Sequence, residues 1–351
     1  MDEYIVTDNM FFVSEEEAMN VEDKIDIVIP WVDPSDSKWQ MDRDKYSPKA
    51  TNEGDNRAIR YRDWDNLHFV FRGIEKYAPW INKVYFVTYG HLPKWLNVNA
   101  PKLQIVKHED YIPKEYLPLF SSHGIELNMH RIEGLSEKFI YFNDDIFLLK
   151  MTKPEDFFQN GLPCDVNISN LIMPDYRTFS PILFNTVACI NKHFSRRTQV
   201  KKKPEQFFNL KYGVVGIAMN LLSSHWGGYV GFYNCHLAFP YLKSTLQEVW
   251  DKEPELLDET CRHRFRNNMD VNQYIFRYWQ LASGKFVPSK VMGKSFNISS
   301  NNNRMLDYIN KSRGKMICIN DSDFEGDFNV VKAQINGALN QKLPEKSCFE
   351  I

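Results

Sequence analysis

The first half of the chain alternates short apolar runs with one segment of helical periodicity. Residues 25–32, 84–87 and 103–106 are apolar and rich in β-branched and aromatic side chains, which is typical of buried strands. Apolar side chains recur at helical spacing over residues 67–77, and Pro79 marks the end of that helix. Alternating strands and helices predict an α/β fold with a mostly parallel, doubly wound sheet, Rossmann-like or GT-A-like.

The central strand of this sheet is predicted just before Asn143, in the run of residues 138–142. This run ends in Asn143-Asp144-Asp145, and a second apolar run follows at once. Carboxylates between buried runs are costly unless something compensates their charge. Along an extended chain Asn143 and Asp145 point to one side, and such oxygen donors at a strand end suit a hard divalent cation. The alternative is a turn at Asn143 and Asp144, with Asp145 capping a helix.

Four segments are expected along the chain. They are a leader over residues 1–24, an α/β core over 25–153, a helical insertion or cap over 154–311, and a strand and helix over 312–351 that return to the core. Further elements follow from local patterns. Loops are expected at 37–62, 108–113 and 299–303, helices from Ser121 or Ser122 and at 244–258, 270–281 and 329–339, and a strand at 316–319.

Composition excludes several classes of protein. The chain is 43% apolar and 25% charged, which is ordinary for a soluble globular protein. A net charge of -2 argues against a nucleic-acid partner, and Lys201–Lys203 is interpreted as a solvated loop. The six cysteines form no CxxC pair, which indicates reduced thiols rather than zinc ligands or disulfides. The first twenty residues lack the features of a signal peptide, and no apolar run reaches the length of a membrane span. We therefore expect a cytoplasmic protein, with peripheral membrane attachment left open.

The end of the first strand supplies two candidate binding residues. Asp33 follows that strand, and loops at the carboxyl ends of strands form the ligand crevice in open α/β sheets. Asp33 would equally serve as a helix N-cap or as an Asx-turn residue. Trp31 could stack on a base or a sugar, or could belong to the core.

Four stretches together resemble the signatures of the Stealth family of sugar-phosphate transferases. Residues 25–33 resemble the first, residues 62–145 the second, His236 to Asp270 with Arg264-Phe265-Arg266 the third, and residues 317–321 the fourth. The resemblance spans about 25–340. The chain departs from the family pattern at Tyr89, at Gly124 and at Ile29-Pro30.

The resemblance implies transfer of a hexose 1-phosphate from a nucleotide diphosphate sugar, similar to UDP-GlcNAc, to a hydroxyl of an oligo- or polysaccharide acceptor. The setting would be capsular or surface polysaccharide synthesis, with a membrane capsule-assembly complex as a further expected partner. It also implies a divalent metal, Mg²⁺ or Mn²⁺. The expected metal ligands are Asn143, Asp144, Asp145 and Asp321.

Basic residues in the matching stretches are candidate phosphate ligands. Arg266 is expected to clamp a phosphate, because a guanidinium fork matches phosphate oxygens, and Asp270 would hold that fork. The alternative for this pair is a surface ion pair. Arg131 is a second candidate, and its alternative is a salt bridge to Glu133 or Asp144.

Three histidines are candidates for the general base. His236 ranks first because an imidazole titrates near neutral pH, and His130 and His123 follow. A histidine in an apolar run is, however, often a core residue. The expected catalytic residues are thus His236, Arg266, Asp145 and Asp33, and the expected substrate-binding residues are Trp31, Arg131, His130, Asp270 and Asn320.

Two other functions remain open at this point. A metal-dependent glycosyltransferase would use the same sheet and acidic motif but release a nucleoside diphosphate. A non-catalytic carbohydrate-binding module would keep the cleft alone, although binding does not require acidic, histidine and arginine motifs together.

Overall fold

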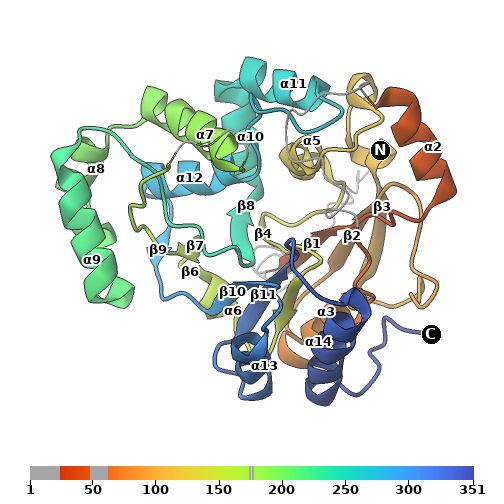
Figure 1. Cartoon of the computed structure of the whole chain (residues 1–351). Coiled ribbons are helices and arrows are strands. Elements are labelled where there is room, and N and C mark those ends of the chain that lie inside the picture. The colour runs from red at the N-terminus through yellow and green to blue at the C-terminus, as the bar shows by residue number, and fades with distance from the viewer. Residues whose placement is uncertain (1–23, 48–61, 174, 176–177) are drawn as a thin grey trace, which may run out of the picture.

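A five-stranded sheet forms the centre of the protein (Figure 1). The computed structural model describes residues 24–47, 62–173, 175 and 178–351, so nearly all of the expected leader lies outside the described residues. In spatial order the strands are β3 (Leu103–Lys107), β2 (Val84–Thr88), β1 (Ile25–Pro30), β4 (Lys138–Tyr141) and β8 (Phe239–Leu242). All neighbours pair in parallel except β4 and β8, which pair antiparallel. The predicted α/β class with a mostly parallel sheet is confirmed.

Both faces of this sheet are covered, because its strands are apolar on both sides. Ile27 and Ile29 of β1 enter one core, whereas Val28 between them enters the other. The first core is closed by α3 (Leu67–Tyr77), α13 (Asn303–Asn310) and α14 (Phe328–Lys342). The second is closed by α5 (Ser122–Leu127), α7 (Ser180–His193), α10 (Lys243–Lys252), α11 (Pro254–Arg262) and α12 (Tyr274–Ser283). The sheet is thus doubly wound, as predicted.

A second, three-stranded sheet lies directly beyond Asn143–Asp145. Its strands are β10 (Gly293–Asn297), β11 (Met316–Asn320) and β5 (Ile146–Leu148), with β11 in the middle. The expected C-terminal strand therefore exists, but it pairs with β10 and β5 rather than with the five-stranded sheet. Residues Asn143–Asp145 therefore link β4 of the five-stranded sheet to β5 of the second sheet. Asn320 at the end of β11 lies beside this link.

Four local predictions are wrong. Residues 37–46 are not a loop but helix α2 (Ser37–Tyr46), and residues 48–61 lie outside the described residues. A short helix, α4 (His108–Tyr111), occupies the segment expected as a loop. The helix expected over 244–258 is two helices, since Pro254 cannot continue α10 and begins α11. The helix expected from residue 270 begins only at Tyr274.

The segment 154–311 contains both helices and strands. It gives β8 to the five-stranded sheet and β10 to the second one. It also forms α6 (Pro154–Phe157), a small sheet of β6 (Phe158–Gln159), β7 (Leu162–Asp165) and β9 (Val287–Pro288), and the outlying helices α8 (Arg196–Lys202) and α9 (Gly213–Leu222). The triple lysine expected in a loop thus lies largely in α8. The proposed division into four segments stays a prediction.

No helix within the described ranges combines the length and the apolar character needed to cross a membrane.

Candidate active site

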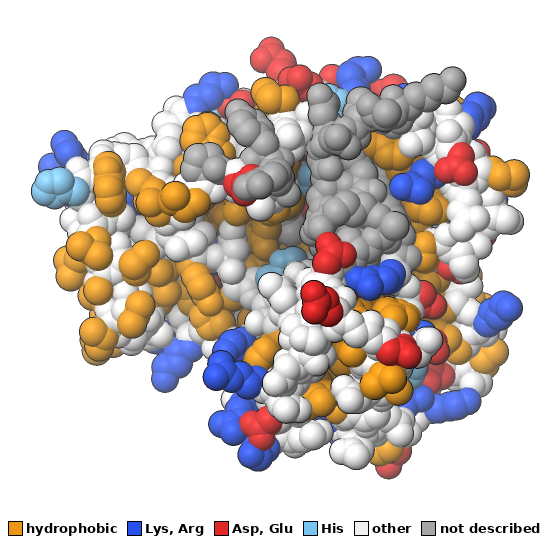
Figure 2. Space-filling view, in the orientation of Figure 1, with side chains coloured by type: hydrophobic (Ala, Val, Ile, Leu, Met, Phe, Trp, Pro, Cys, Tyr) orange, Lys and Arg blue, Asp and Glu red, His pale blue; other side chains and the backbone are white. Residues whose placement is uncertain are grey.

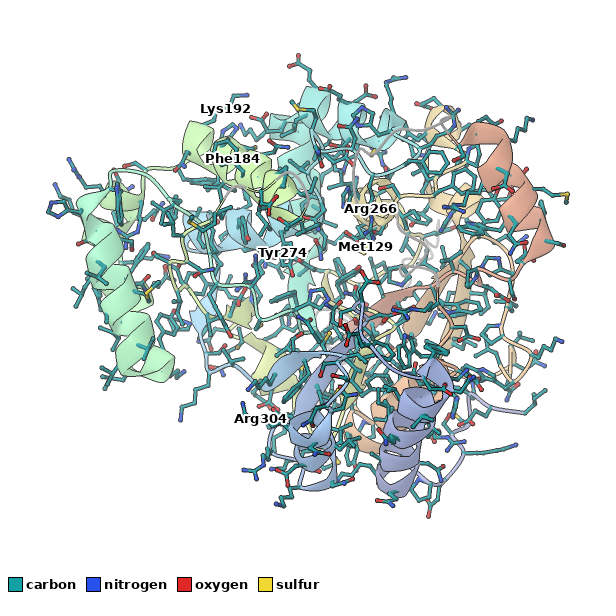
Figure 3. All side chains as sticks on the ribbon, in the orientation of Figure 1. Met129, Phe184, Lys192, Arg266, Tyr274 and Arg304 are labelled. Atoms are coloured by element: carbon teal, nitrogen blue, oxygen red, sulfur yellow. The ribbon has the colours of Figure 1, made fainter. Side chains whose placement is uncertain are left out.

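A cavity of about 320 Å³ opens where β1, β4 and β11 end. Eight of the residues predicted for the site line it. They are Trp31, Asn143, Asp144, Asp145, His236, Arg266, Asn320 and Asp321. Figure 3 shows Arg266 near the middle of the molecule, above the strands, whereas Phe184 and Lys192 lie on α7 at the periphery. Segments far apart in the sequence therefore meet at one edge of the sheet, as the rule for open α/β sheets predicts.

Asp145 is the centre of the acidic stretch. Its Oδ2 accepts a hydrogen bond from Cys318 Sγ at 3.3 Å and lies 3.9 Å from His236 Nε2. One ligand atom from each of these three residues lies within 4.8 Å of the others. Burial raises the pKa of the Cys318 thiol well above its usual value, with the Asp145 carboxylate as a second cause. The cysteine therefore stays protonated and acts as the hydrogen-bond donor to Asp145.

His236 enters the cavity from the loop before β8. Its Nε2 also lies 3.5 Å from Asn143 Nδ2, and its side chain is 41% exposed. The backbone of His236 has a φ of 46°, in the left-handed region that few non-glycine residues adopt, although Asn, Asp and His do so more often than the rest. Such strain gathers at functional sites, because the surrounding fold must hold it in place.

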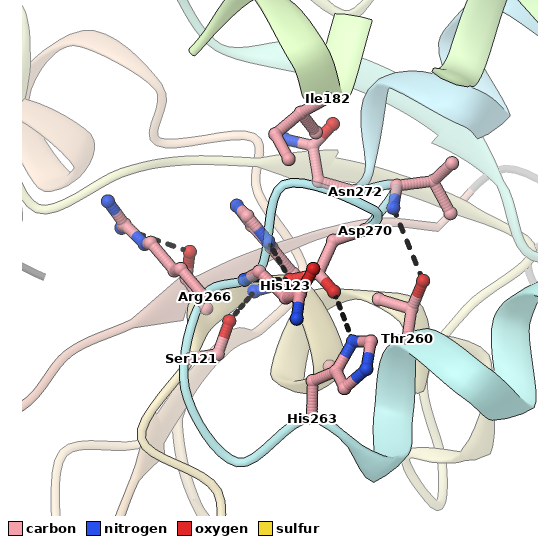
Figure 4. Close-up of polar contacts among 12 residues, drawn as sticks. Ser121, His123, Ile182, Thr260, His263, Arg266, Asp270 and Asn272 are labelled. Atoms are coloured by element: carbon pink, nitrogen blue, oxygen red, sulfur yellow. Dashed lines mark hydrogen bonds and ion pairs between the residues drawn. The ribbon is translucent and has the colours of Figure 1, made fainter. Parts of the chain in front are cut away.

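Asp270 organises the loop that carries Arg266 (Figure 4). Its fully buried carboxylate accepts hydrogen bonds from His123 Nδ1 at 2.7 Å, His263 Nδ1 at 2.6 Å and the backbone of Asn267 at 3.0 Å. Arg266 Nη2 reaches Ser122 Oγ at 3.3 Å. Arg266 and Asp270 are thus not an ion pair on a helix surface. Both lie in one loop, and the buried carboxylate of Asp270 fixes the base of that loop.

Asp321 is engaged by an arginine that sequence reasoning did not single out. Arg62 donates from Nε to Oδ2 at 3.0 Å and from Nη2 to Oδ1 at 2.9 Å. Asn320 donates from Nδ2 to Asn297 Oδ1 at 2.8 Å, across the β10–β11 pair. The strand end is therefore fixed on both sides, and Arg62 adds a positive charge to the rim of the cavity.

The end of β1 places Trp31 in the cavity wall, whereas Asp33 stabilises the turn that follows the strand. Trp31 stacks on Phe86 with ring centroids 5.5 Å apart and meets His91 edge-on at 5.3 Å. Asp33 accepts from the backbone of Ser35 at 2.8 Å and from its hydroxyl at 2.6 Å. These are the bonds of an Asx-turn, and Asp33 does not line the described cavity.

His130, Arg131 and His123 lie behind the cavity wall rather than in it. Burial, helped by the nearby Arg131 charge, lowers the pKa of His130 to about 3. Arg131 packs over the ring of Trp250 at 4.9 Å, so it supports the core instead of facing a phosphate. Burial also lowers the pKa of His123, against the opposing effect of Asp270.

Glu126 is a cavity residue that sequence reasoning missed. It projects from α5, is 5% exposed, and accepts a hydrogen bond from Tyr141 at 2.8 Å. Its second oxygen has no hydrogen-bond partner among the described residues. Burial raises the pKa of Glu126 to about 7, although the Tyr141 hydroxyl acts in the opposite direction. A glutamate in the apolar stretch 125–129 was the available signal.

Most of this chain matches proteins that are already known. Models of the Stealth conserved regions match it at residues 23–51 for region 1, 60–165 for region 2 and 235–278 for region 3. The capsular polysaccharide phosphotransferase WcwK of Streptococcus pneumoniae is 41% identical over 330 residues, which cover 93% of this chain and 98% of that protein. The chain belongs to the Stealth family.

Other relatives of this Stealth protein have similar lengths. The receptor polysaccharide phosphotransferase WefC of Streptococcus oralis is 39% identical, with 93% of this chain and 99% of that protein covered. The exopolysaccharide phosphotransferase cps2G of Lactiplantibacillus plantarum is 37% identical, with 93% and 96% covered. The solved galactosyltransferase LgtC matches 84% of this chain and 86% of its own at 12% identity, but its TM-score of 0.35 is too low to support an argument.

The acidic stretch of this Stealth protein has the donors that a hard cation prefers. Asp144 is exposed to solvent at the cavity, but the surrounding walls remove part of its hydration. This desolvation raises the pKa of Asp144 to about 7, and the charge of Asp145 adds to the shift. Two adjacent carboxylates that disfavour each other's charge are stabilised by a cation between them. The carboxylate and amide oxygens therefore fit Mg²⁺ or Mn²⁺ better than a thiophilic metal.

Replacement of Asp144 with Asn is expected to raise the melting temperature at pH 8 without metal. The raised pKa means that the folded protein holds a proton between about pH 4 and pH 7 that the unfolded chain releases, so stability falls as pH rises through this window and the full cost is present above pH 7. Asn imitates the neutral acid, and its advantage should shrink towards pH 4. Thermal unfolding in EDTA measures the effect, and saturating Mg²⁺ should return the advantage to the native protein. An equal or lower melting temperature for D144N at pH 8 would contradict the argument.

Replacement of Asp270 with Ala is expected to lower the free energy of unfolding by about 3 kcal/mol, because two imidazoles and a backbone amide lose a buried carboxylate. Urea denaturation gives the value. Asp251→Ala is the matched control, since that residue is exposed on α10 and its carboxylate accepts from Gln247 one turn away. Equal losses in the two variants would show that Asp270 is not the anchor of the loop.

Proposed function

We propose that this chain transfers a sugar 1-phosphate from a nucleotide diphosphate sugar to a hydroxyl of a saccharide acceptor. The support comes from the family and from relatives that are named capsular, receptor and exopolysaccharide phosphotransferases. Capsular or surface polysaccharide would be the product, which makes an oligo- or polysaccharide the natural acceptor.

The observation that carries the proposal is the meeting of three kinds of group in one cavity. An imidazole at His236, adjacent carboxylates at Asp144 and Asp145, and a guanidinium at Arg266 all line it. Phosphoryl transfer requires a base for the nucleophile and positive charge for the phosphate oxygens. A simple binding module has no need for a strained histidine beside a pair of carboxylates.

The reaction needs one bond formed and one broken. The acceptor oxygen attacks the phosphorus that carries the sugar, and the bond from this phosphorus to the bridging oxygen breaks, so that a nucleoside monophosphate leaves. His236 takes the proton of the attacking hydroxyl, and the Asp145 carboxylate lies 3.9 Å from its Nε2. Arg266 holds non-bridging phosphate oxygens through its guanidinium fork.

Asn143, Asp144 and Asp145 would hold the divalent cation, and Asp321 is the fourth proposed ligand, already oriented by Arg62. Such a cation neutralises phosphate charge and aligns the reacting oxygens.

The remaining cavity residues would bind and orient the substrates. Trp31 offers an aromatic face to the base or sugar of the donor. Glu126 is proposed to carry a proton near neutral pH and to donate a hydrogen bond into the cavity. Asp270 is proposed as a positioning residue that acts through the Arg266 loop, and Asn320 as a polar contact at the far rim.

The identity of the released nucleotide tests the proposal. The protein would be incubated with Mg²⁺, a panel of nucleotide diphosphate hexoses and an oligosaccharide acceptor, and the products analysed by chromatography and phosphorus NMR. A nucleoside monophosphate together with a new phosphodiester signal is the expected result. Release of a nucleoside diphosphate would make the protein a glycosyltransferase, and donor binding without any turnover would make it a binding module.

A further inference from the structure

Helix α9 carries its apolar side chains on the outside. Its inward face presents Gly216 and Asn220, and the Asn220 amide is fully buried. That amide accepts from the backbone of Ser169 at 2.7 Å and donates to the carbonyls of Asn167 at 2.7 Å and Phe207 at 2.6 Å. The helix is therefore anchored by a polar residue, the reverse of an ordinary surface helix.

The outward face of α9 is a continuous apolar surface. Val214 is 86% exposed and Leu222 is 69% exposed, and one helix face carries Val214, Val215, Ala218, Leu221 and Leu222. Leu210 before the helix and Trp226 after it extend the same apolar character. Figure 2 shows hydrophobic side chains gathered on the left of the molecule, over α9. A surface of this kind marks an interaction site.

Positive charge borders this surface. Between residues 178 and 247 the only Asp or Glu is Glu205. In the same stretch Arg197, Lys201, Lys202 and Lys203 are exposed on or next to α8, whereas Lys192 pairs with Glu253 and Lys243 contacts the carbonyls of Ile132 and Leu135. Arg196 at the start of α8 is buried and donates to the Asn220 carbonyl at 2.8 Å, which ties the basic helix α8 to α9. Lys211 lies two residues before α9. The rest of the chain is acidic enough to give a net charge of -2, so the positive charge is local.

We propose that α9, its flanking residues Leu210 and Trp226, and the exposed cations of α8 form a docking surface for an anionic phospholipid bilayer. Valine and leucine side chains would enter the boundary of the acyl chains, and Trp226 would lie at the headgroup level. Arg197, Lys201 and Lys202 would meet the phosphate headgroups. This inference goes beyond the proposed reaction and does not depend on it.

The charge pattern selects the bilayer over a second copy of the chain. A symmetric dimer through α9 would bring the same surface of both copies together and place one basic α8 near the other. Like charges opposed in this way are unfavourable, whereas an anionic membrane surface complements them.

Vesicle sedimentation tests the docking surface. The full chain would be mixed with vesicles of phosphatidylglycerol and phosphatidylcholine, or of phosphatidylcholine alone, and the pelleted fraction measured. Binding to the anionic vesicles is expected, and V215D/L222D should reduce it about tenfold or more, because two charges would enter the apolar boundary. K201Q/K202Q and high salt should each weaken it, since both reduce the attraction to anionic headgroups.

Matched controls keep the outcome clear. Val330→Asp removes a 53%-exposed valine from α14, and it should leave vesicle binding unchanged. Val215 and Leu222 are exposed, so V215D/L222D should change neither the melting temperature nor the turnover of a soluble acceptor.

Failure to bind anionic vesicles, or equal binding by V215D/L222D, would overturn the proposal. Dissociation of a dimer by V215D/L222D in sedimentation velocity without lipid would assign the surface to a second copy. A chain that bound vesicles but released no nucleotide would refute only the proposed reaction.

Discussion

Asp145→Asn is expected to lower kcat/KM about 10³-fold while leaving the fold intact. The carboxylate lies beside Asp144, accepts from Cys318 and faces His236 at 3.9 Å, so it is the negative charge that a cation and a protonated imidazole would share. Its loss should remove about 4 kcal/mol of transition-state stabilisation, which corresponds to this change in rate. The asparagine keeps the shape and the Cys318 contact, which isolates the charge.

Two measurements separate this effect from general damage. Calorimetric titration should show weaker Mg²⁺ binding to D145N, and additional Mg²⁺ should restore part of the activity. Asp251→Asn, on the exposed side of α10, is the matched control and should retain full activity. Activity of D145N within threefold of the native enzyme, or unchanged metal affinity, would remove Asp145 from the proposed centre.

Apolar runs are sufficient to predict the strands, because a strand buried on both faces of the sheet is largely apolar along its length. β1, β2 and β4 were predicted in this way, and so was α3, whose apolar face recurs with helical spacing. Helix α2 was missed because only Trp39 of its ten residues is buried, so no apolar period appears. The one usable signal was Asp36, whose side chain caps the backbone of Trp39.

The site was predictable where it lies at strand ends and obscure where it depends on long-range packing. Asn143–Asp145 follow β4, and Asn320 ends β11 of the second sheet, so these residues meet where the acidic stretch links the two sheets. Glu126 offers only its charge between apolar neighbours as a local signal, and its place in the cavity depends on the tertiary contact with Tyr141. Position at a strand end is not sufficient, however. Asp33 also follows a strand, but its carboxylate bonds to Ser35 in a turn and does not line the cavity.

His236→Asn is expected to lower kcat about 10³-fold, in the range that loss of a general base produces. Asn is the informative replacement because the backbone at His236 has a φ of 46°, which Asn tolerates better than Ala does. The donor should bind almost as well as before, since Arg266 and the carboxylates remain, so KM for the donor should change little. Stopped-flow or chromatographic measurement of nucleotide release gives both constants.

The double variant D145N/H236N decides whether the two residues act as one unit. If Asp145 works largely by supporting the protonated His236, the double variant should be hardly slower than the worse single variant. If Asp145 works only through the metal, the two losses should multiply. His225→Asn, an exposed histidine near α9, is the control and should keep full activity. Retention of kcat within threefold in H236N would exclude His236 as the base and make Glu126, a cavity carboxyl whose pKa burial raises to about 7, the next candidate for that role.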